Sequence, residues 1–394
     1  MNTVLDPGVL EALRAAASEF VDIRRDIHRH PEMGFKEHRT SALVAARLKA
    51  WGYEVDVGLG GTGVVGTLRR GTGKKSIGIR ADMDALPIAE ASGRAWASEH
   101  PGLMHACGHD GHTAILLAAA RQLAEAGDFS GTLNLIFQPA EEGLGGAVKM
   151  MDDGLFERHP CDAIFALHNS PGVPQGTLVF RDGPMMASSD AVKITLDGRG
   201  GHAAFPHRTA DPVVAAASII MALQTVVSRN VDPLHTAVVS VGTLHAGTAV
   251  NVIPETATIE LSVRALDPEV RDLLEARIKA LVQAQAESFG VRAQVDYHRG
   301  YAVLVNNKPE TDFARQVALD LLGPGRVVLE GPQVTGSEDF SFMLQKRPGC
   351  YLLIGNGDGE GSCMVHNPGY DFNDDNIAAG STYWVALAQR YLRD

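Results

Sequence analysis

The sequence predicts an α/β protein with a mixed central sheet, into which a second, α+β domain is inserted. Strand-like and helix-like segments alternate in the first half of the chain, which is typical of an α/β domain. Near Gly183 the order becomes strand, helix, strand, strand, helix, strand, which is the ferredoxin-like order. The alternating pattern resumes after Tyr301. We therefore expect a discontinuous first domain over residues 1–182 and 301–394, and a satellite domain over residues 183–300.

The elements of both domains follow from hydrophobic periodicity and turn residues. In the first domain the expected helices are Leu10–Phe20, Thr40–Trp51, Thr113–Ala126 and Thr311–Leu322, and the expected strands are Ser76–Arg80, Thr132–Gln138, Ala163–Leu167 and Tyr351–Gly355. Pro139 suits the first turn of a further helix beginning near Ala140 and Glu141. In the satellite domain the expected strands are Val192–Leu196, Thr236–Thr243, Thr256–Ala265 and Arg292–Tyr297, and the expected helices are Pro212–Val227 and Pro268–Phe289.

The composition is that of a globular protein and argues against several kinds of partner. The chain has 394 residues, 45% of them hydrophobic, and a net charge of −12. Such an acidic balance argues against nucleic acid and anionic membranes. The longest mostly apolar stretch, Val213–Leu223, is shorter than the roughly 18 residues of a membrane span. The start of the chain lacks a signal-peptide pattern and the four cysteines lack paired spacing, so we expect a cytoplasmic location.

Residues with metal-binding chemistry are concentrated between Met104 and His112. In an extended chain Cys107 and His109 would point to the same side, so that two good ligands for a divalent metal converge. Asp110 is a plausible N-cap of the helix that follows, and the positive end of that helix would help to hold Cys107 as a thiolate. The alternative is a polar loop with a buried free cysteine.

A second cluster, with Glu141 and Glu142, follows the strand that ends at Gln138. Neighbouring residues at a helix start diverge by about 100°, so the two carboxylates are expected to do different jobs. One would bind a metal ion while the other faces the substrate as a general base. The alternative is a solvated acidic first turn, which the helix dipole favours in any case.

Further candidates lie at other strand ends, where open α/β sheets bind their ligands. Asp82, Asp84 and His168 each follow a predicted strand, and His366 lies in a loop near the end of the chain. A lone histidine at a strand end is more often structural. One cysteine, three histidines and one glutamate nevertheless exceed what one zinc ion needs, so we expect two divalent ions that share a water.

These residues resemble those of the M20 metallopeptidase and amidohydrolase family, in particular its hippurate hydrolase, N-acyl-amino-acid and auxin-conjugate amidohydrolase branch. The similarity runs in order over nearly the whole chain. Its motifs are Arg24–His28 with Pro31 and Glu32, Arg80–Pro87, Met104–His112, Gln138–Gly143, Leu167–Asn169, Gly200–Ala204 with Pro206, Asn251–Pro254, Ser337–Phe340 and His366–Pro368.

The resemblance implies a role for each of these residues and a reaction. The implied metal ligands are Cys107, His109, Glu142, His168 and His366, and the implied catalytic base is Glu141. A phosphorylase/hydrolase-like catalytic domain is implied, together with a satellite domain that pairs two subunits into a homodimer or a larger homo-oligomer. The implied substrates are small N-acyl amino acids of the hippurate or N-acetyl type, whose amide bond is hydrolysed to a carboxylic acid and a free amino acid.

The sequence departs from the better-known peptidases of this family at one point. Asp82-Met83-Asp84 stands where those peptidases have a His-x-Asp pair. Asp84 is therefore carried over only as a residue that orients the metal site. The change also leaves the metal open, because a thiolate favours zinc or nickel whereas a carboxylate also suits manganese.

The satellite domain is expected to complete the active site. We expect Glu141 to take a proton from the attacking water and to return it to the departing amine. His202, in its own or in a partner's active site, would stabilise the oxyanion together with the metal ions. Asn251 and Arg264 would hold the α-carboxylate of the substrate. The alternative for His202 is a histidine that only braces its loop, and the alternative for Arg264 is an ordinary surface charge pair. The remaining histidines, expected to be structural or supporting, are His105, His112, His207, His235 and His245.

Other functions fit parts of the pattern. A dipeptidase or carboxypeptidase could use the same scaffold and the same ligands. A metal-binding protein without catalysis would not need a spare carboxylate at Glu141. The glycine-rich segment Gly58–Gly63 is weak evidence for a dinucleotide site, because no convincing helix follows it.

Overall fold

The computed structural model describes residues 7–359 and 362–393, and its chain forms two compact units. The first unit consists of Met1–Gly183, Val305–Pro332 and Phe342–Asp394, and the second of Pro184–Leu304 and Gln333–Ser341. The second unit is thus inserted into the first. Residues 301–304 and 333–341 group with the second unit, whereas the sequence places all of residues 301–394 in the first.

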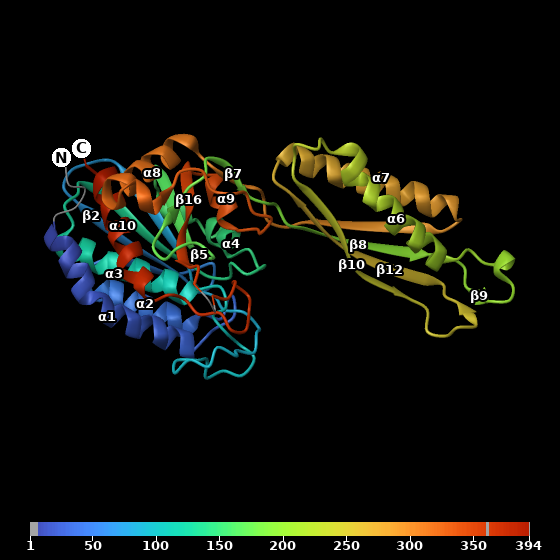
Figure 1. Cartoon of the computed structure of the whole chain (residues 1–394), viewed down its shortest axis with the longest axis horizontal. Helices are drawn as coiled ribbons and strands as arrows, with labels where there is room; N and C mark the ends of the chain where they lie inside the picture. Colours follow the sequence, from blue (N-terminus) through green and yellow to red (C-terminus); the bar gives the residue numbers. More distant parts are fainter. Residues whose placement is uncertain (1–6, 360–361, 394) are drawn as a thin grey trace. The chain divides into compact units, whose positions relative to one another are not determined.

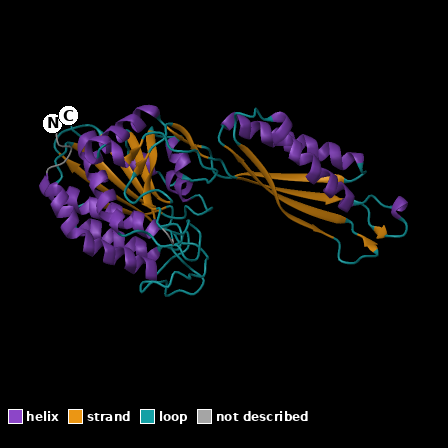
Figure 2. Cartoon of the chain, viewed as in Figure 1, coloured by secondary structure: helices purple, strands orange, loops and turns teal. Residues whose placement is uncertain are grey.

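The first unit is built on an eight-stranded mixed sheet with the order β1-β2-β4-β3-β5-β16-β6-β15 (Figures 1 and 2). Its strands are β1 (Glu54–Leu59), β2 (Gly63–Arg70), β3 (Ser76–Asp82), β4 (Gly131–Gln138), β5 (Ala163–Pro171), β6 (Leu178–Val179), β15 (Val327–Val328) and β16 (Gly349–Gly357). The central strands β4, β3, β5 and β16 run parallel. The predicted α/β class with a mixed sheet is therefore confirmed.

Helices pack on this sheet and bury its apolar strands. They are α1 (Pro7–Arg29), α2 (His38–Ala50), α3 (His109–Ala126), α4 (Gly146–Asp152), α5 (Leu155–Arg158), α8 (Lys308–Leu322) and α10 (Asp375–Tyr391). Helix α3 contacts both α1 and α10 (Figure 1). It is buried from His109 to Ala120, because its apolar side chains and alanines allow close packing on every side.

The glycine-rich segment after β1 is a hairpin turn. β1 and β2 pair antiparallel across it, and Gly58, Gly60 and Gly61 adopt positive φ angles of 92°, 66° and 90°. Glycine suits these positions because it has no Cβ to clash with the backbone. The segment is therefore a tight turn and does not precede a helix.

The second unit has the predicted ferredoxin-like order. Its elements are β8 (Asp190–Asp197), α6 (Pro212–Asn230), β10 (Ala237–Ala246), β12 (Thr256–Ala265), α7 (Pro268–Ser288) and β13 (Arg292–Arg299), with a small ladder of β9 (Gly201–His202) and β11 (Val252–Ile253). The four long strands form an antiparallel sheet in the order β10-β12-β8-β13, and α6 and α7 pack side by side on one face (Figure 2). Asp211 and Asp267 cap the two helices, each with a proline at the first position.

Helix α6 is longer than the apolar stretch that the sequence analysis singles out. Among the described residues it is the one helix whose length and composition would allow it to cross a membrane. Its side chains Ala215, Ile219 and Leu223 are fully buried in the apolar core of the second unit. Packing on the sheet therefore explains one face of the helix, whereas Val213, Val214 and Met221 on it are exposed.

Three short elements lie where the chain passes from one unit to the other. They are β7 (Gly183–Met186), β14 (Leu304–Asn306) and α9 (Phe340–Leu344).

Candidate metal centre

The carboxyl ends of the parallel strands bring the predicted ligand segments to one edge of the sheet. β3 ends at Asp82 and β4 at Gln138, and these two residues are register partners. His168 lies within β5, opposite Leu353 of β16. Because parallel neighbours all end at the same edge, side chains that follow them are brought together.

The five predicted ligands lie close together at this edge. Cys107 Sγ lies 3.3 Å from His168 Nε2, and His366 Nε2 lies 3.2 Å from Glu142 Oε1. His109 Nε2 lies 3.9 Å from the same Glu142 oxygen. Three overlapping sets each have their ligand atoms within 4.8 Å of one another, namely Cys107, His109 and His168; Cys107, Glu142 and His366; and His109, Glu141 and Glu142.

The donor atoms of this cluster fit divalent metal ions. Nε2 of His109 and Oε1 of Glu142 are buried and make no hydrogen bond of good geometry among the described residues, whereas His109 Nδ1 faces Asp84. A buried polar atom without a hydrogen bond is costly, and a cation bound to Nε2 and Oε1 would satisfy both while leaving Nδ1–H to Asp84. Sulfur, imidazole nitrogen and carboxylate oxygen together are a donor set typical of zinc and related ions.

The ring orientation of His168 is suited to metal binding. Its Nδ1 lies 2.7 Å from the carbonyl oxygen of Asn169. A carbonyl can only accept, so Nδ1 carries the proton and Nε2 presents its lone pair toward Cys107. This is the arrangement by which backbone carbonyls usually fix metal-binding histidines.

Helix α3 begins at His109, two residues earlier than an Asp110 cap requires. Gly108 occupies the N-cap position with φ 85°, so Cys107 and His109 flank a sharp turn and are not in extended chain. A Cβ on Gly108 would clash with Asn169 and Tyr370. The expected Asp110 cap is therefore wrong, because this carboxylate is used elsewhere.

The thiol of Cys107 is buried among carboxylates. Burial, and then the carboxylates of Glu142 and Glu141, raise the pKa of the Cys107 thiol well above its ordinary value. This direction is opposite to the one expected from the start of α3. Loss of the thiol proton must instead accompany binding of a cation.

Asp110 belongs to a buried ion network beneath the ligands. Its Oδ2 lies 2.7 Å from Arg24 Nε and 2.8 Å from His28 Nδ1. Burial alone would lower the pKa of His28, but Asp110 and Glu90, which face its two ring nitrogens, raise it to about 9. Burial lowers the pKa of neighbouring His105 to about 4.

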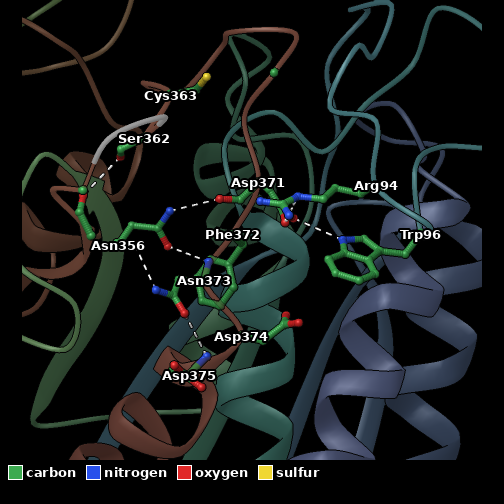
Figure 3. Close-up of a pocket in the computed structure, with 13 residues that line it drawn as sticks. Arg94, Trp96, Asn356, Ser362, Cys363, Asp371, Phe372, Asn373, Asp374 and Asp375 are labelled. Atoms are coloured by element: carbon green, nitrogen blue, oxygen red, sulfur yellow. Dashed lines mark hydrogen bonds and ion pairs between the residues drawn. The ribbon is translucent and has the colours of Figure 1, made fainter.

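The same network extends to the segment after His366. Arg24 Nη2 lies 2.6 Å from Asp371 Oδ1. Asp371 also accepts the indole N–H of Trp96 at 3.2 Å and pairs with Arg94 at 3.0 Å, at the wall of a polar pocket (Figure 3). Helix α1 is thereby tied both to the start of α3 and to the chain that carries the last predicted ligand.

The segment Pro139–Glu142 is not a helix. β4 ends at Gln138, the next helix, α4, begins only at Gly146, and Ala140 has a left-handed φ of 55°. The expectation of a helix start near Ala140 is therefore wrong. The two glutamates are instead held by Asp84, whose Oδ1 and Oδ2 accept the backbone N–H groups of Glu141 and Glu142, each at 3.0 Å.

Asp84 also contacts the metal cluster directly. Its Oδ1 lies 3.3 Å from His109 Nδ1. Burial would lower the pKa of His109, but Asp82 and Asp84 raise it to about 10. Asp84 thus lies between His109, a predicted ligand, and the two glutamates.

His112, expected from the sequence to be structural or supporting, forms a support together with Asn169, for which the sequence analysis predicted no role of its own. Asn169 donates its backbone N–H to His112 Nε2 at 2.9 Å and its side-chain N–H to the Cys107 carbonyl at 2.6 Å. His112 Nδ1 therefore carries the proton and donates to Asp82 at 2.7 Å. Tyr370 donates its hydroxyl to Asn169 at 2.8 Å. The one available signal was that Asn169 directly follows a predicted ligand.

The predicted residues of the second unit lie on its surface. His202 is on β9 and Asn251 in the turn before β11, and both are exposed. The backbone N–H of Ala204 donates to His202 Nδ1 at 3.1 Å, so a neutral ring carries its proton on the exposed Nε2. Arg264, on β12, donates to the carbonyl of Thr335 at 3.1 Å.

Comparison with known proteins agrees with this site. Residues 78–390 match the model of peptidase family M20/M25/M40. The chain belongs to this family. The hippurate hydrolase of Campylobacter jejuni is 45% identical over 375 residues, covering 95% of this chain and 97% of that protein. The N-acetyl-L-cysteine deacetylase of Bacillus subtilis is 38% identical over 385 residues, covering 96% and 90%.

A solved structure extends this likeness to three dimensions. The YXEP protein of Bacillus subtilis, described as a dinuclear metal binding peptidase from the M20 family, has a TM-score of 0.84 and 33% identity. The match covers 96% of this chain and 99% of that one. The resemblance to family M20 that the sequence motifs indicate is thus confirmed, and the protein is an M20 amidohydrolase.

Proposed function

We propose that this M20 enzyme hydrolyses the amide bond of N-acyl amino acids of the hippurate or N-acetyl type, releasing a carboxylic acid and a free amino acid. The observation that carries the proposal is a cluster of five candidate ligands with one further, buried carboxylate, Glu141, beside it. Cys107 and His109 are buried in this cluster, Glu142 and His168 are half-buried, and His366 is exposed. The names of the relatives, hippurate hydrolase and N-acetyl-L-cysteine deacetylase, support the same substrate class.

Cys107, His109, Glu142, His168 and His366 would hold two divalent ions. When bound, such ions polarise a carbonyl and lower the pKa of water toward neutrality. The sulfur and nitrogen donors suit zinc or nickel, and the carboxylate also suits manganese. We propose zinc, nickel or manganese on this chemistry.

Glu141 is the residue proposed to move the proton. Its carboxylate is buried and lies within the same 4.8 Å set as His109 and Glu142, so it can accept a proton from water beside the acyl carbonyl. The same carboxylic acid can then protonate the departing amine, which leaves a free amino acid.

The second unit would supply the remaining polar contacts. His202 presents its Nε2–H to solvent and can donate it to the oxyanion that forms on the carbonyl. Asn251 and Arg264 are proposed to bind the α-carboxylate. We also propose that the unit pairs with a second copy of the chain, as a homodimer or larger homo-oligomer. A cytoplasmic location stays a prediction.

The proposal is tested with Glu141→Gln, which keeps the volume of the side chain and removes its basicity. Wild type and variant are each loaded with zinc, nickel or manganese, and metal content is measured by elemental analysis. Hydrolysis of hippurate, N-acetyl amino acids and dipeptides is then followed. We expect the variant to keep its metal and to lose at least about 1000-fold in kcat. Equal turnover by the variant would remove Glu141 from this role, and faster hydrolysis of dipeptides would favour a dipeptidase.

A further inference from the structure

The residue that precedes the proposed base has an unusual backbone. Ala140 has φ 55°, in the left-handed region that a residue with a Cβ seldom adopts, and its side chain is fully buried. Its conformation sets the direction in which the next residue, Glu141, leaves the main chain. Something must hold Ala140 in place, because an ordinary extended or helical φ would turn Glu141 elsewhere.

The side chain of Glu37 holds this peptide. Glu37, just before α2, is fully buried, and its Oε1 accepts the backbone N–H of Ala140 at 2.9 Å. Its Oε2 accepts the hydroxyl of Thr62, which lies in the turn between β1 and β2. Burial raises the pKa of Glu37 above its ordinary value, so placing a carboxyl here costs free energy.

Two carboxylates therefore bind three consecutive N–H groups. Glu37 takes the N–H of Ala140, and Asp84 takes those of Glu141 and Glu142. The carbonyl of Ala140 accepts the N–H of Gly146 at 2.9 Å, which fixes the other side of the same residue. Asp84 also contacts the metal cluster, whereas Glu37 reaches the proposed base only through Ala140.

We propose that Glu37 is a positioning residue for hydrolysis, which keeps Ala140 in its left-handed conformation and so aims the Glu141 carboxylate at the ligand cluster. The inference rests on the proposed role of Glu141. The competing explanation is that Glu37 merely joins α2 to the hairpin and contributes only to stability.

Glu32 provides a matched control for that explanation. It lies five residues earlier on the same loop, and its two carboxylate oxygens also accept two backbone N–H groups, those of Arg39 and Thr40. These bonds hold the start of α2 and do not reach Ala140. Glu32→Leu therefore removes a comparable structural contact and should leave kcat unchanged.

Three variants separate the bonds that Glu37 makes. Glu37→Leu leaves the Ala140 N–H without its acceptor, and we expect kcat to fall about 30- to 100-fold, because a displacement near 1 Å of a reacting group costs about that much. Glu37→Gln can still accept from Ala140 and can donate to Thr62, so we expect kcat within about threefold of wild type. Thr62→Val removes only the bond between Thr62 and Glu37, and we expect a loss in kcat intermediate between those of the two Glu37 variants. This variant keeps the inference testable if Glu37→Leu folds poorly.

A glycine at position 140 supplies the decisive test. Glycine adopts positive φ without strain, so Glu37→Leu combined with Ala140→Gly no longer needs an acceptor to hold that conformation. We expect the double variant to recover at least about tenfold in kcat over Glu37→Leu. A purely structural role of Glu37 would not be rescued by this change, since a glycine only adds freedom to the chain.

Two measurements are read together. Hydrogen exchange in the peptide spanning residues 139–146, measured without added metal, should accelerate in Glu37→Leu but not in Glu32→Leu. KM and metal content should stay near wild type while kcat falls. Wild-type kcat in Glu37→Leu, or no recovery in the double variant, overturns the inference. If the wild-type protein itself hydrolyses no N-acyl amino acid, the proposed function fails first and the inference falls with it.

Discussion

The substitution Asp84→Asn, which replaces one carboxylate oxygen with an NH₂ group, should lower kcat even when the enzyme is saturated with metal. The two oxygens of Asp84 each accept an N–H group, one from each of the paired glutamates. In Asp84→Asn one of these oxygens becomes an NH₂ group, which faces an N–H donor and cannot accept from it. A hydrogen bond to a charged acceptor contributes about 1.5–3 kcal/mol. If the loss of about 2 kcal/mol is felt fully in the transition state, kcat falls about 30-fold.

The assay compares kcat for an N-acyl amino acid in wild type and Asp84→Asn, both saturated with the same metal. Saturation matters because Asp84 also lies 3.3 Å from His109 Nδ1, and losing such a partner typically weakens metal binding 10- to 100-fold. Asp162→Asn is the matched control, since this exposed carboxylate also accepts two bonds, both from Ser76. If metal-saturated Asp84→Asn keeps kcat within about threefold of wild type, Asp84 does not orient the glutamates.

Three further outcomes are expected. The pKa of His28 is raised from 6.5 to about 9. The protonated histidine should therefore stabilise the fold by about 3 kcal/mol below pH 6.5, and this contribution should be lost as the pH rises through 9. The free energy of urea unfolding should show this pH dependence in wild type but not in His28→Gln. Gly108→Ala should destabilise the fold by about 3 kcal/mol, because φ is 85° and the new Cβ meets Asn169, and a melting temperature equal to wild type would contradict this. Removal of the metal by a chelator should abolish hydrolysis, and adding the metal back should restore it. Cys107→Ala should contain less metal than wild type by elemental analysis, and an unchanged metal content would show that the Cys107 thiol is not a ligand.

Regular elements of the inserted unit were predictable from their apolar residues, whereas the buried helix α10 was not predicted. In the inserted unit β8, α6, β12 and α7 each bury one apolar face against a single core. Helix α1 was predicted too short, since it continues to Arg29. Its last turns bury Arg24 and His28 in ion pairs, which hydrophobic periodicity counts as solvent-exposed positions.

The residue types of the site, and two of its supports, Asp84 and His112, were expected from the sequence, whereas other supports were not. Cysteine, histidine and paired glutamates in short motifs indicate metal chemistry, and the structure brings those residues together. Glu37 and Asn169 carry no such signal, because they act through backbone groups of segments far away in sequence. The left-handed turn at Ala140 was equally invisible, since alanine before two glutamates is the ordinary composition of a helix start.

The spread of the ligand cluster along the chain has a consequence for biosynthesis. Cys107 is synthesised before the inserted unit and His366 after it. Until His366 has been made, a nascent chain therefore offers a cation only part of the proposed set of donors. A chain that folds without the metal would then lack the proposed link between segments on either side of the inserted unit.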